Sequence, residues 1–172
     1  MRKQKHKLVT RFVAPIGLAL GIFLTGAPSA TAGADIYGVG GGSINLGGTK
    51  FVKFAFSGHT GAQGDFGSFR FTIEDFGPPL DAHVDVDCVN VSPFGPGAGG
   101  FIGGPVKRAT PQPNAYGLTP GSELVFGIND FGEPSGPMPD ELTGYFGSPQ
   151  VCKLLAPIPA APISQGNIVV KP

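Results

Sequence analysis

Glycine and proline are so frequent after residue 32 that long helices are not expected there. Of the 29 glycines and 18 prolines in the chain, 26 and 16 fall in residues 33–172, so 42 of these 140 positions break helices. Inside a helix, a glycine costs about 1 kcal/mol and a proline about 3 kcal/mol relative to alanine. The sequence therefore predicts short strands joined by many turns.

Alternation of apolar and polar residues locates these strands. In residues 68–74, Phe69, Phe71 and Ile73 share one face, and polar residues occupy the other. Similar patterns occur at residues 51–56, 82–91, 123–130, 142–146 and 167–170, and glycine-diluted ones at 36–39, 43–46 and 101–106. About seven to nine short strands separated by turn signals predict an all-β fold, an antiparallel β-sandwich or barrel.

The pattern changes phase within residues 82–91. Val84, Val86 and Cys88 fall on one face of an ideal strand, whereas the following apolar residues, Val89 and Val91, fall on the other. A one-residue change of phase is typical of a β-bulge. We therefore expect a bulge near Cys88.

The first 32 residues are organised like a secretory signal peptide. Residues 1–11 hold five basic and no acidic side chains, residues 12–25 are apolar and uncharged, and Ala30 and Ala32 form an A-x-A cleavage site. The apolar run is shorter than the roughly 20 residues that cross a bilayer. We expect a secreted, extracellular protein with one β domain over residues 33–172; an uncleaved membrane anchor is the alternative.

Charge limits the partners of the mature chain. Removal of residues 1–32 leaves seven of the 12 basic residues and all 12 acidic ones, a net charge of about −5. A nucleic-acid binder must neutralise many phosphates with basic side chains. We expect no nucleic-acid partner and, after cleavage, no membrane contact; the expected partner is an unknown extracellular protein or polymer.

Cys88 and Cys152 are the only cysteines in the chain. Thiols of exported proteins meet oxidising conditions, in which they pair. The sequence therefore predicts a Cys88–Cys152 disulfide, with two buried free thiols as the alternative.

Signatures of catalysis are missing from the sequence. His59 lies in a polar, glycine-rich stretch and His83 at the start of a predicted strand, and no nucleophile elbow accompanies either. We expect a protein without enzymatic activity. Neighbouring carboxylates such as Asp85 and Asp87 keep a secreted hydrolase as a third hypothesis.

Acidic residues also suggest calcium. Asp130, Glu133, Asp140 and Glu141 surround a loop rich in proline and glycine, and Ca²⁺ prefers six to eight oxygen ligands that such loops can supply. Solvated acidic side chains are the alternative. The leading hypothesis is a non-catalytic extracellular β-domain with a structural or interaction role, and a calcium-assisted carbohydrate-binding module is second.

Three stretches in order, VDVDCVNV (residues 84–91), FGINDFGEP (126–134) and QGNIVVKP (165–172), carry a resemblance. Together they resemble a family of uncharacterised small secreted proteins and surface-protein modules of Gram-positive bacteria, mainly actinobacteria. The resemblance covers roughly residues 38–172 and implies a β-sandwich or barrel in which Cys88 and Cys152 match the family's cysteines. The insertion SPFGPGAGG after Val91 departs from the family pattern. The family implies no activity.

Overall fold

The structure is a computed structural model that describes residues 35–47, 50–74, 78–132, 136–146 and 149–172. The predicted signal peptide and Glu133 lie outside these residues. The elements are β1 (Ile36–Gly47), β2 (Lys50–Gly61), β3 (Gly64–Glu74), β4 (Leu80–Val86), β5 (Cys88–Phe94), β6 (Gly97–Thr110), β7 (Glu123–Asp130), β8 (Glu141–Phe146), α1 (Pro149–Leu154), β9 (Ala161–Pro162) and β10 (Gln165–Lys171).

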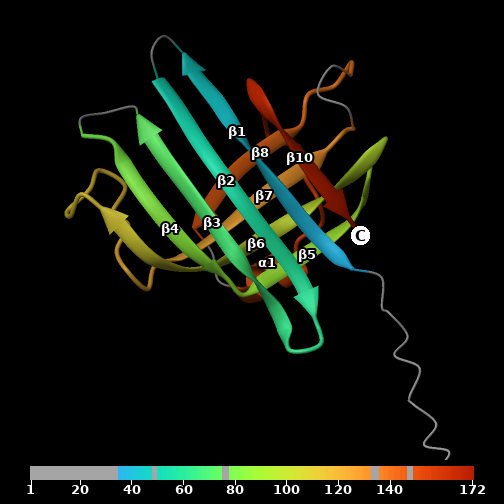
Figure 1. The fold of residues 1–172 in the computed structure, drawn as a ribbon, viewed down its shortest axis with the longest axis horizontal. Helices are drawn as coiled ribbons and strands as arrows, with labels where there is room; N and C mark the ends of the chain where they lie inside the picture. Colours follow the sequence, from blue (N-terminus) through green and yellow to red (C-terminus); the bar gives the residue numbers. More distant parts are fainter. Residues whose placement is uncertain (1–34, 48–49, 75–77, 133–135, 147–148) are drawn as a thin grey trace, which may run out of the picture. The chain divides into compact units, whose positions relative to one another are not determined.

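All strand pairs are antiparallel and follow the order β10-β1-β2-β3-β4-β6-β7-β8-β9, with β5 beside β6. This continuous sheet curls into two layers, as Figure 1 shows. We call β10, β1, β2, β3, β4 and the end of β6 the front sheet. The rear sheet consists of the start of β6 with β5, β7, β8 and β9. The prediction of an all-β, antiparallel fold is confirmed.

Strand β6 belongs to both sheets. Its residues 97–105 pair with β5 and β7, and its residues 106–110 pair with β4. At the change of partner, a Cβ atom on Gly104 would collide with the carbonyl oxygen of Asp85. Glycine is therefore required where the two sheets separate.

The main core lies between the two sheets. Phe54, Phe56, Phe69 and Phe71 project from the front sheet, as the alternation predicted, and all are buried. Phe126 meets them from the rear sheet, with its ring centroid 3.7 Å from that of Phe69. Burial of large apolar side chains contributes about 1.5–3 kcal/mol each to stability.

Glycines of β1 make room for this core. Gly38 and Gly40 face the interior, where a Cβ on Gly38 would lie 2.6 Å from Cδ1 of Ile128 and one on Gly40 would lie 3.0 Å from the Phe56 ring. The sequence predicted two short strands, at residues 36–39 and 43–46. In the structure they form one continuous strand, β1, which includes the three glycines at 40–42.

The phase change in residues 82–91 occurs one residue earlier than expected. Val84 and Val86 face the main core, Asp87 separates β4 from β5, and Val89 then returns to the main core. Cys88 belongs to a different cluster, with Phe101, Val125 and Cys152. The prediction that Cys88 shares a face with Val84 and Val86 is wrong because the break falls at Asp87.

Candidate functional site

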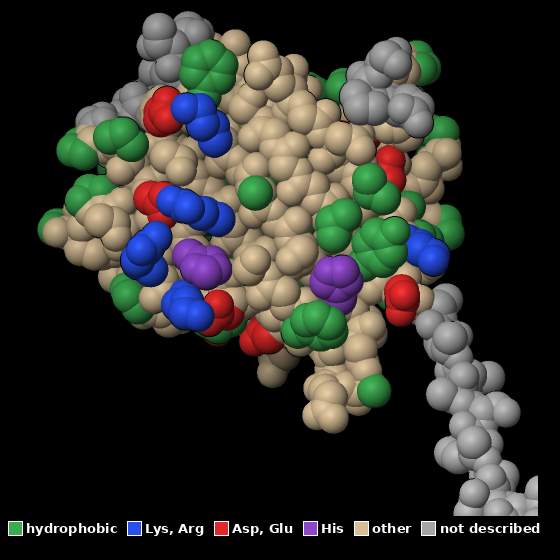
Figure 2. All heavy atoms as spheres, in the orientation of Figure 1, with side chains coloured by type: hydrophobic (Ala, Val, Ile, Leu, Met, Phe, Trp, Pro, Cys, Tyr) green, Lys and Arg blue, Asp and Glu red, His purple; other side chains and the backbone are tan. Residues whose placement is uncertain are grey.

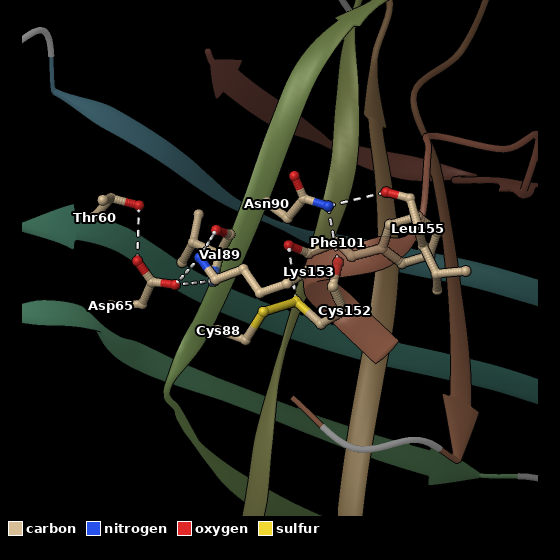
Figure 3. The surroundings of a disulfide bond; sticks show 9 residues. All are labelled: Thr60, Asp65, Cys88, Val89, Asn90, Phe101, Cys152, Lys153 and Leu155. Atoms are coloured by element: carbon tan, nitrogen blue, oxygen red, sulfur yellow. Dashed lines mark hydrogen bonds and ion pairs between the residues drawn. A yellow bond between two sulfur atoms is a disulfide. The ribbon is translucent and has the colours of Figure 1, made fainter. Parts of the chain in front are cut away.

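The predicted disulfide is present and attaches α1 to the rear sheet (Figure 3). Cys88 and Cys152 are joined with 6.4 Å between their Cα atoms, and both are fully buried. The amide nitrogen of Asn90 donates to the carbonyl oxygens of Cys152 (2.8 Å) and Leu155 (2.9 Å). A disulfide indicates an environment outside the reducing cytoplasm.

Beside the disulfide, Asp65 and Lys153 occupy the free edge of β5 (Figure 3). The backbone N–H of Val89 donates to Asp65 Oδ2 at 2.8 Å, and Lys153 Nζ donates to the Val89 carbonyl at 2.7 Å and to the same carboxylate. Burial acts to raise the pKa of Asp65. Hydrogen bonds from Lys153, Val89 and Thr60 outweigh it, so the pKa is lowered. Covered edges resist pairing with other chains.

Three of the four calcium candidates accept hydrogen bonds from backbone N–H groups. Asp140 is buried, and its carboxylate accepts N–H groups of Phe131 (2.9 Å) and Ile168 (2.7 Å). Asp130 accepts the N–H of Val170 at 2.9 Å. Asp130 and Asp140 thus join the edge of β10 to the end of β7 and the start of β8. Burial raises the pKa of Asp140, although both backbone hydrogen bonds act to lower it.

Glu141 has a similar role on the outer side of the rear sheet. Its Oε2 accepts the side-chain amide of Asn129 at 2.9 Å and the N–H of Ala160 at 2.8 Å. Within the described residues, no three His, Cys, Asp or Glu side chains are arranged to hold a metal ion. The fourth candidate, Glu133, lies outside them, and calcium binding stays a prediction.

Both described histidines lie on the outer face of the front sheet (Figure 2). His59 lies between Tyr37 and Phe66 in one cross-strand row, with ring centroids 5.8 and 5.4 Å away. The ring of His59 is stacked against that of Phe66. His83 is flanked by Arg70 and Arg108 on the neighbouring strands. Both arginines pair with Asp81, and hydrogen bonding to Arg70 lowers the pKa of that carboxyl.

Asp85 and Asp87 lie in different surroundings. Asp85 lies on the outer face of β4 and pairs with Lys107 at 3.3 Å. Asp87 lies in the break between β4 and β5, where burial raises its pKa. Burial likewise raises the pKa of Glu123, with a further contribution from Asp87. None of these three carboxylates lines the cavity that lies between the two sheets.

That cavity, which we call the apolar pocket, has a volume of about 330 Å³ and lies between the two sheets. Its size falls within the range of about 300–1,000 Å³ that is typical of small-molecule sites. Its lining is almost entirely hydrocarbon and comes from both sheets and from the loop before β7: Ile44, Leu46, Val52, Phe54, Phe69, Phe71, Ile73, Tyr116, Leu118, Leu124, Phe126, Leu142, Thr143, Gly144 and Ala161.

The loop before β7 is held over the pocket by side-chain amides. Asn114 Oδ1 accepts the N–H groups of Tyr116 and Leu118, both at 3.1 Å. The Leu118 carbonyl accepts from Asn114 Nδ2 at 2.7 Å and from Gln112 Nε2 at 2.6 Å. These bonds place Leu118 and Tyr116 in the pocket wall.

Sequence reasoning missed this pocket. Its lining comes from strand ends that are distant in the sequence, such as Leu46, Ile73 and Leu142, and alternation marks these residues only as apolar. Whether inward-facing side chains fill the space between two sheets depends on register and curvature. The composition offered one indirect signal, since 14 phenylalanines are accompanied by few charges.

No protein-family model matches the chain, and no curated protein or solved structure shows significant similarity to it. The resemblance to secreted actinobacterial proteins stays a prediction. In the part of the chain that the structure describes, no helix is long and apolar enough to cross a membrane.

Proposed function

We propose that this protein is an exported, non-catalytic β-domain that binds a small apolar molecule between its two sheets. The observation that carries the proposal is the apolar pocket of about 330 Å³. A cavity of this size, walled by aromatic and aliphatic side chains, favours ligands that leave water for an apolar environment.

The chemistry of the lining supports binding without catalysis. None of the described lining residues carries a carboxylate, imidazole, amine or guanidinium group. Proton transfer and nucleophilic attack need such groups, or an activated hydroxyl or thiol, within hydrogen-bond distance of the substrate. The hydroxyls of Thr143 and Tyr116 are the polar side-chain groups that this wall offers.

Export is supported by two independent features of the chain. The first is the signal-peptide pattern of residues 1–32, and the second is the disulfide. Expression of the full chain in a Gram-positive host tests this part of the proposal. The protein recovered from the medium should have the mass of residues 33–172 with one disulfide, whereas a mass that includes residues 1–32 contradicts it.

Carbohydrate binding is the second candidate. It is favoured by the Tyr37–His59–Phe66 row, whose Phe66 is 55% exposed on the outer face of the front sheet. Sugars stack on exposed aromatic faces, but the His59 and Phe66 rings are stacked on each other. The apolar pocket therefore ranks first. Glycan binding that is lost in Phe66→Ala would reverse this ranking.

Displacement of a neutral fluorescent naphthylamine dye tests the pocket. Leu46 lines the pocket and is 48% exposed, so Leu46→Glu places a charge in its wall without emptying the core. A charge at this half-exposed rim should weaken binding of the neutral dye by several-fold. The matched control is Val169→Glu, because Val169 is 40% exposed but lies outside the pocket. Equal dye binding by both variants and the parent, or no binding by the parent, contradicts the proposal.

A further inference from the structure

We propose that the ligand is a single unbranched hydrocarbon chain, held in the apolar pocket with its polar head outside in solvent. This inference rests on the proposed function and specifies the ligand class. It follows from the chemistry of the pocket wall, the small volume of the pocket and the exposure of the rim.

The wall excludes a charged or strongly polar group from the interior. Phe54 and Phe71 face Phe126 and Leu142 across the pocket, and no ionic side chain among the described lining residues could pair with a charged head. An unpaired charge moved from water into such surroundings is strongly disfavoured. The part of the ligand that enters is therefore hydrocarbon.

The pocket is also small, with a volume of about 330 Å³ between the two sheets. Two stacked sheets lie about 10 Å apart, and side chains from both inner faces project into that space. In its wall, the rings of Phe69 and Phe126 are in parallel contact, with 3.7 Å between centroids and 7° between planes, so no space remains between these two rings. A single hydrocarbon chain can bend to follow the space left between these side chains, whereas a rigid fused ring system would need the sheets to move apart.

Exposure rises toward one end of the pocket. Leu46 is 48% exposed, Ala161 is also exposed, and Val52 and Ile73 are half-buried, whereas Phe69 is fully buried. The rim is therefore apolar, and it offers no ionic anchor among the described lining residues. The fold selects the chain and leaves the head unspecified.

A chain-length series tests the inference. Dye displacement is measured with saturated fatty acids from octanoate to palmitate and with their methyl esters, below their micelle concentrations. Each added methylene should strengthen binding by about fourfold until the chain fills the pocket, after which affinity levels off. Each acid and its ester should bind about equally. Affinity that is independent of chain length, or tighter binding of a sterol than of palmitate, overturns the inference.

Two substitutions of Leu46 test where the head lies. With Leu46→Lys at the rim, a fatty acid should bind several-fold more tightly than its ester, because the ammonium attracts the carboxylate. With Leu46→Glu, the order should reverse. The matched controls Val169→Lys and Val169→Glu should leave the ratio of acid to ester unchanged. If the ratio is the same in both Leu46 variants, the head does not lie at this rim and the inference is overturned.

Filling the pocket gives a third measurement. Gly144 lines the pocket, and a Cβ there would lie 3.3 Å from the Phe126 ring, closer than an ordinary van der Waals contact. Gly144→Leu should make affinity level off at a shorter chain, with octanoate least affected; an unchanged plateau contradicts the inference. If the parent protein binds the dye but fatty-acid affinity does not depend on chain length, the inference fails and the proposed function stands. If the parent protein does not bind the dye at all, both the inference and the proposed function are contradicted.

Discussion

The rings of Phe69 on β3 and Phe126 on β7 lie face to face, with 3.7 Å between their centroids and 7° between their planes. This contact joins the front sheet to the rear sheet in the wall of the apolar pocket. Offset and edge-to-face aromatic pairs contribute about 0.5–1.5 kcal/mol beyond the area that they bury, and a face-to-face pair lies at the lower end of that range.

A double-mutant cycle should detect this coupling. Phe69→Leu and Phe126→Leu each remove one ring of the stack and leave an apolar side chain in its place. We expect the cost of the double variant in unfolding free energy, measured in urea, to differ from the sum of the two single costs by about 0.5–1 kcal/mol. Strictly additive costs would show that the rings contribute only buried area.

Loss of the disulfide should destabilise the protein strongly. The bridge closes a separation of 64 residues, for which chain entropy predicts a contribution of about 4 kcal/mol. The double variant Cys88→Ala, Cys152→Ala should therefore unfold at a much lower urea concentration than the oxidised parent. The reduced parent serves as the control, and equal midpoints for the oxidised and reduced parent would contradict the prediction.

Asp65→Asn should cost most stability at neutral pH. The pKa of Asp65 is lowered from 3.8 in the folded state, so its ionised form stabilises the fold above that value, and this contribution is lost as pH falls through the lowered pKa. Near pH 7 we expect a cost of about 1–3 kcal/mol, because the Val89 N–H and Lys153 lose a charged acceptor. Unfolding midpoints of variant and parent should converge in acid.

Asp140→Asn should show the opposite trend. Burial raises the pKa of Asp140 above 3.8, so the folded state binds this proton more tightly than the unfolded state does. Stability then falls as pH rises through the window between 3.8 and the raised value. The cost of the substitution should therefore be greater in acid than at neutral pH. A difference curve parallel to that of Asp65→Asn would contradict the assignment.

Gly38→Ala should be rescued by Ile128→Val. The new methyl group on residue 38 would lie 2.6 Å from Cδ1 of Ile128, and valine lacks that atom. Ile128→Val alone should cost about 0.5–1.5 kcal/mol. In the double variant, we expect a cost below the sum of the two single costs, measured by thermal unfolding. A sum or more would show that another contact limits the space.

The strands were predictable because their signal is local. In β3, Phe69, Phe71 and Ile73 alternate with polar residues that stay outside, so the period of two alone assigns the faces. The break at Asp87 could not be placed to the residue, because valines on both sides of it fit either phase. Only pairing with β6, through the hydrogen bond from Asp87 N to Gly103 O, decides its position.

The site depended on information that no local pattern contains. In the sequence, Asp140 has the features of a solvated acid or a calcium ligand. Its carboxylate accepts the Ile168 N–H only because the fold places β10 beside it, 28 residues later in the chain. The helix α1 has only six residues, too few for a helical period to be recognised in the sequence. It is held by Cys152 and by the amide of Asn90, both of which act over more than sixty residues of sequence.

The division of β6 between two sheets has a consequence for how the protein unfolds. The same fourteen residues form hydrogen bonds with β4 in the front sheet and with β5 and β7 in the rear sheet. Unfolding of either sheet therefore removes a hydrogen-bonded strand from the other. On heating, both sheets should therefore unfold in one cooperative transition, with equal calorimetric and van't Hoff enthalpies of unfolding.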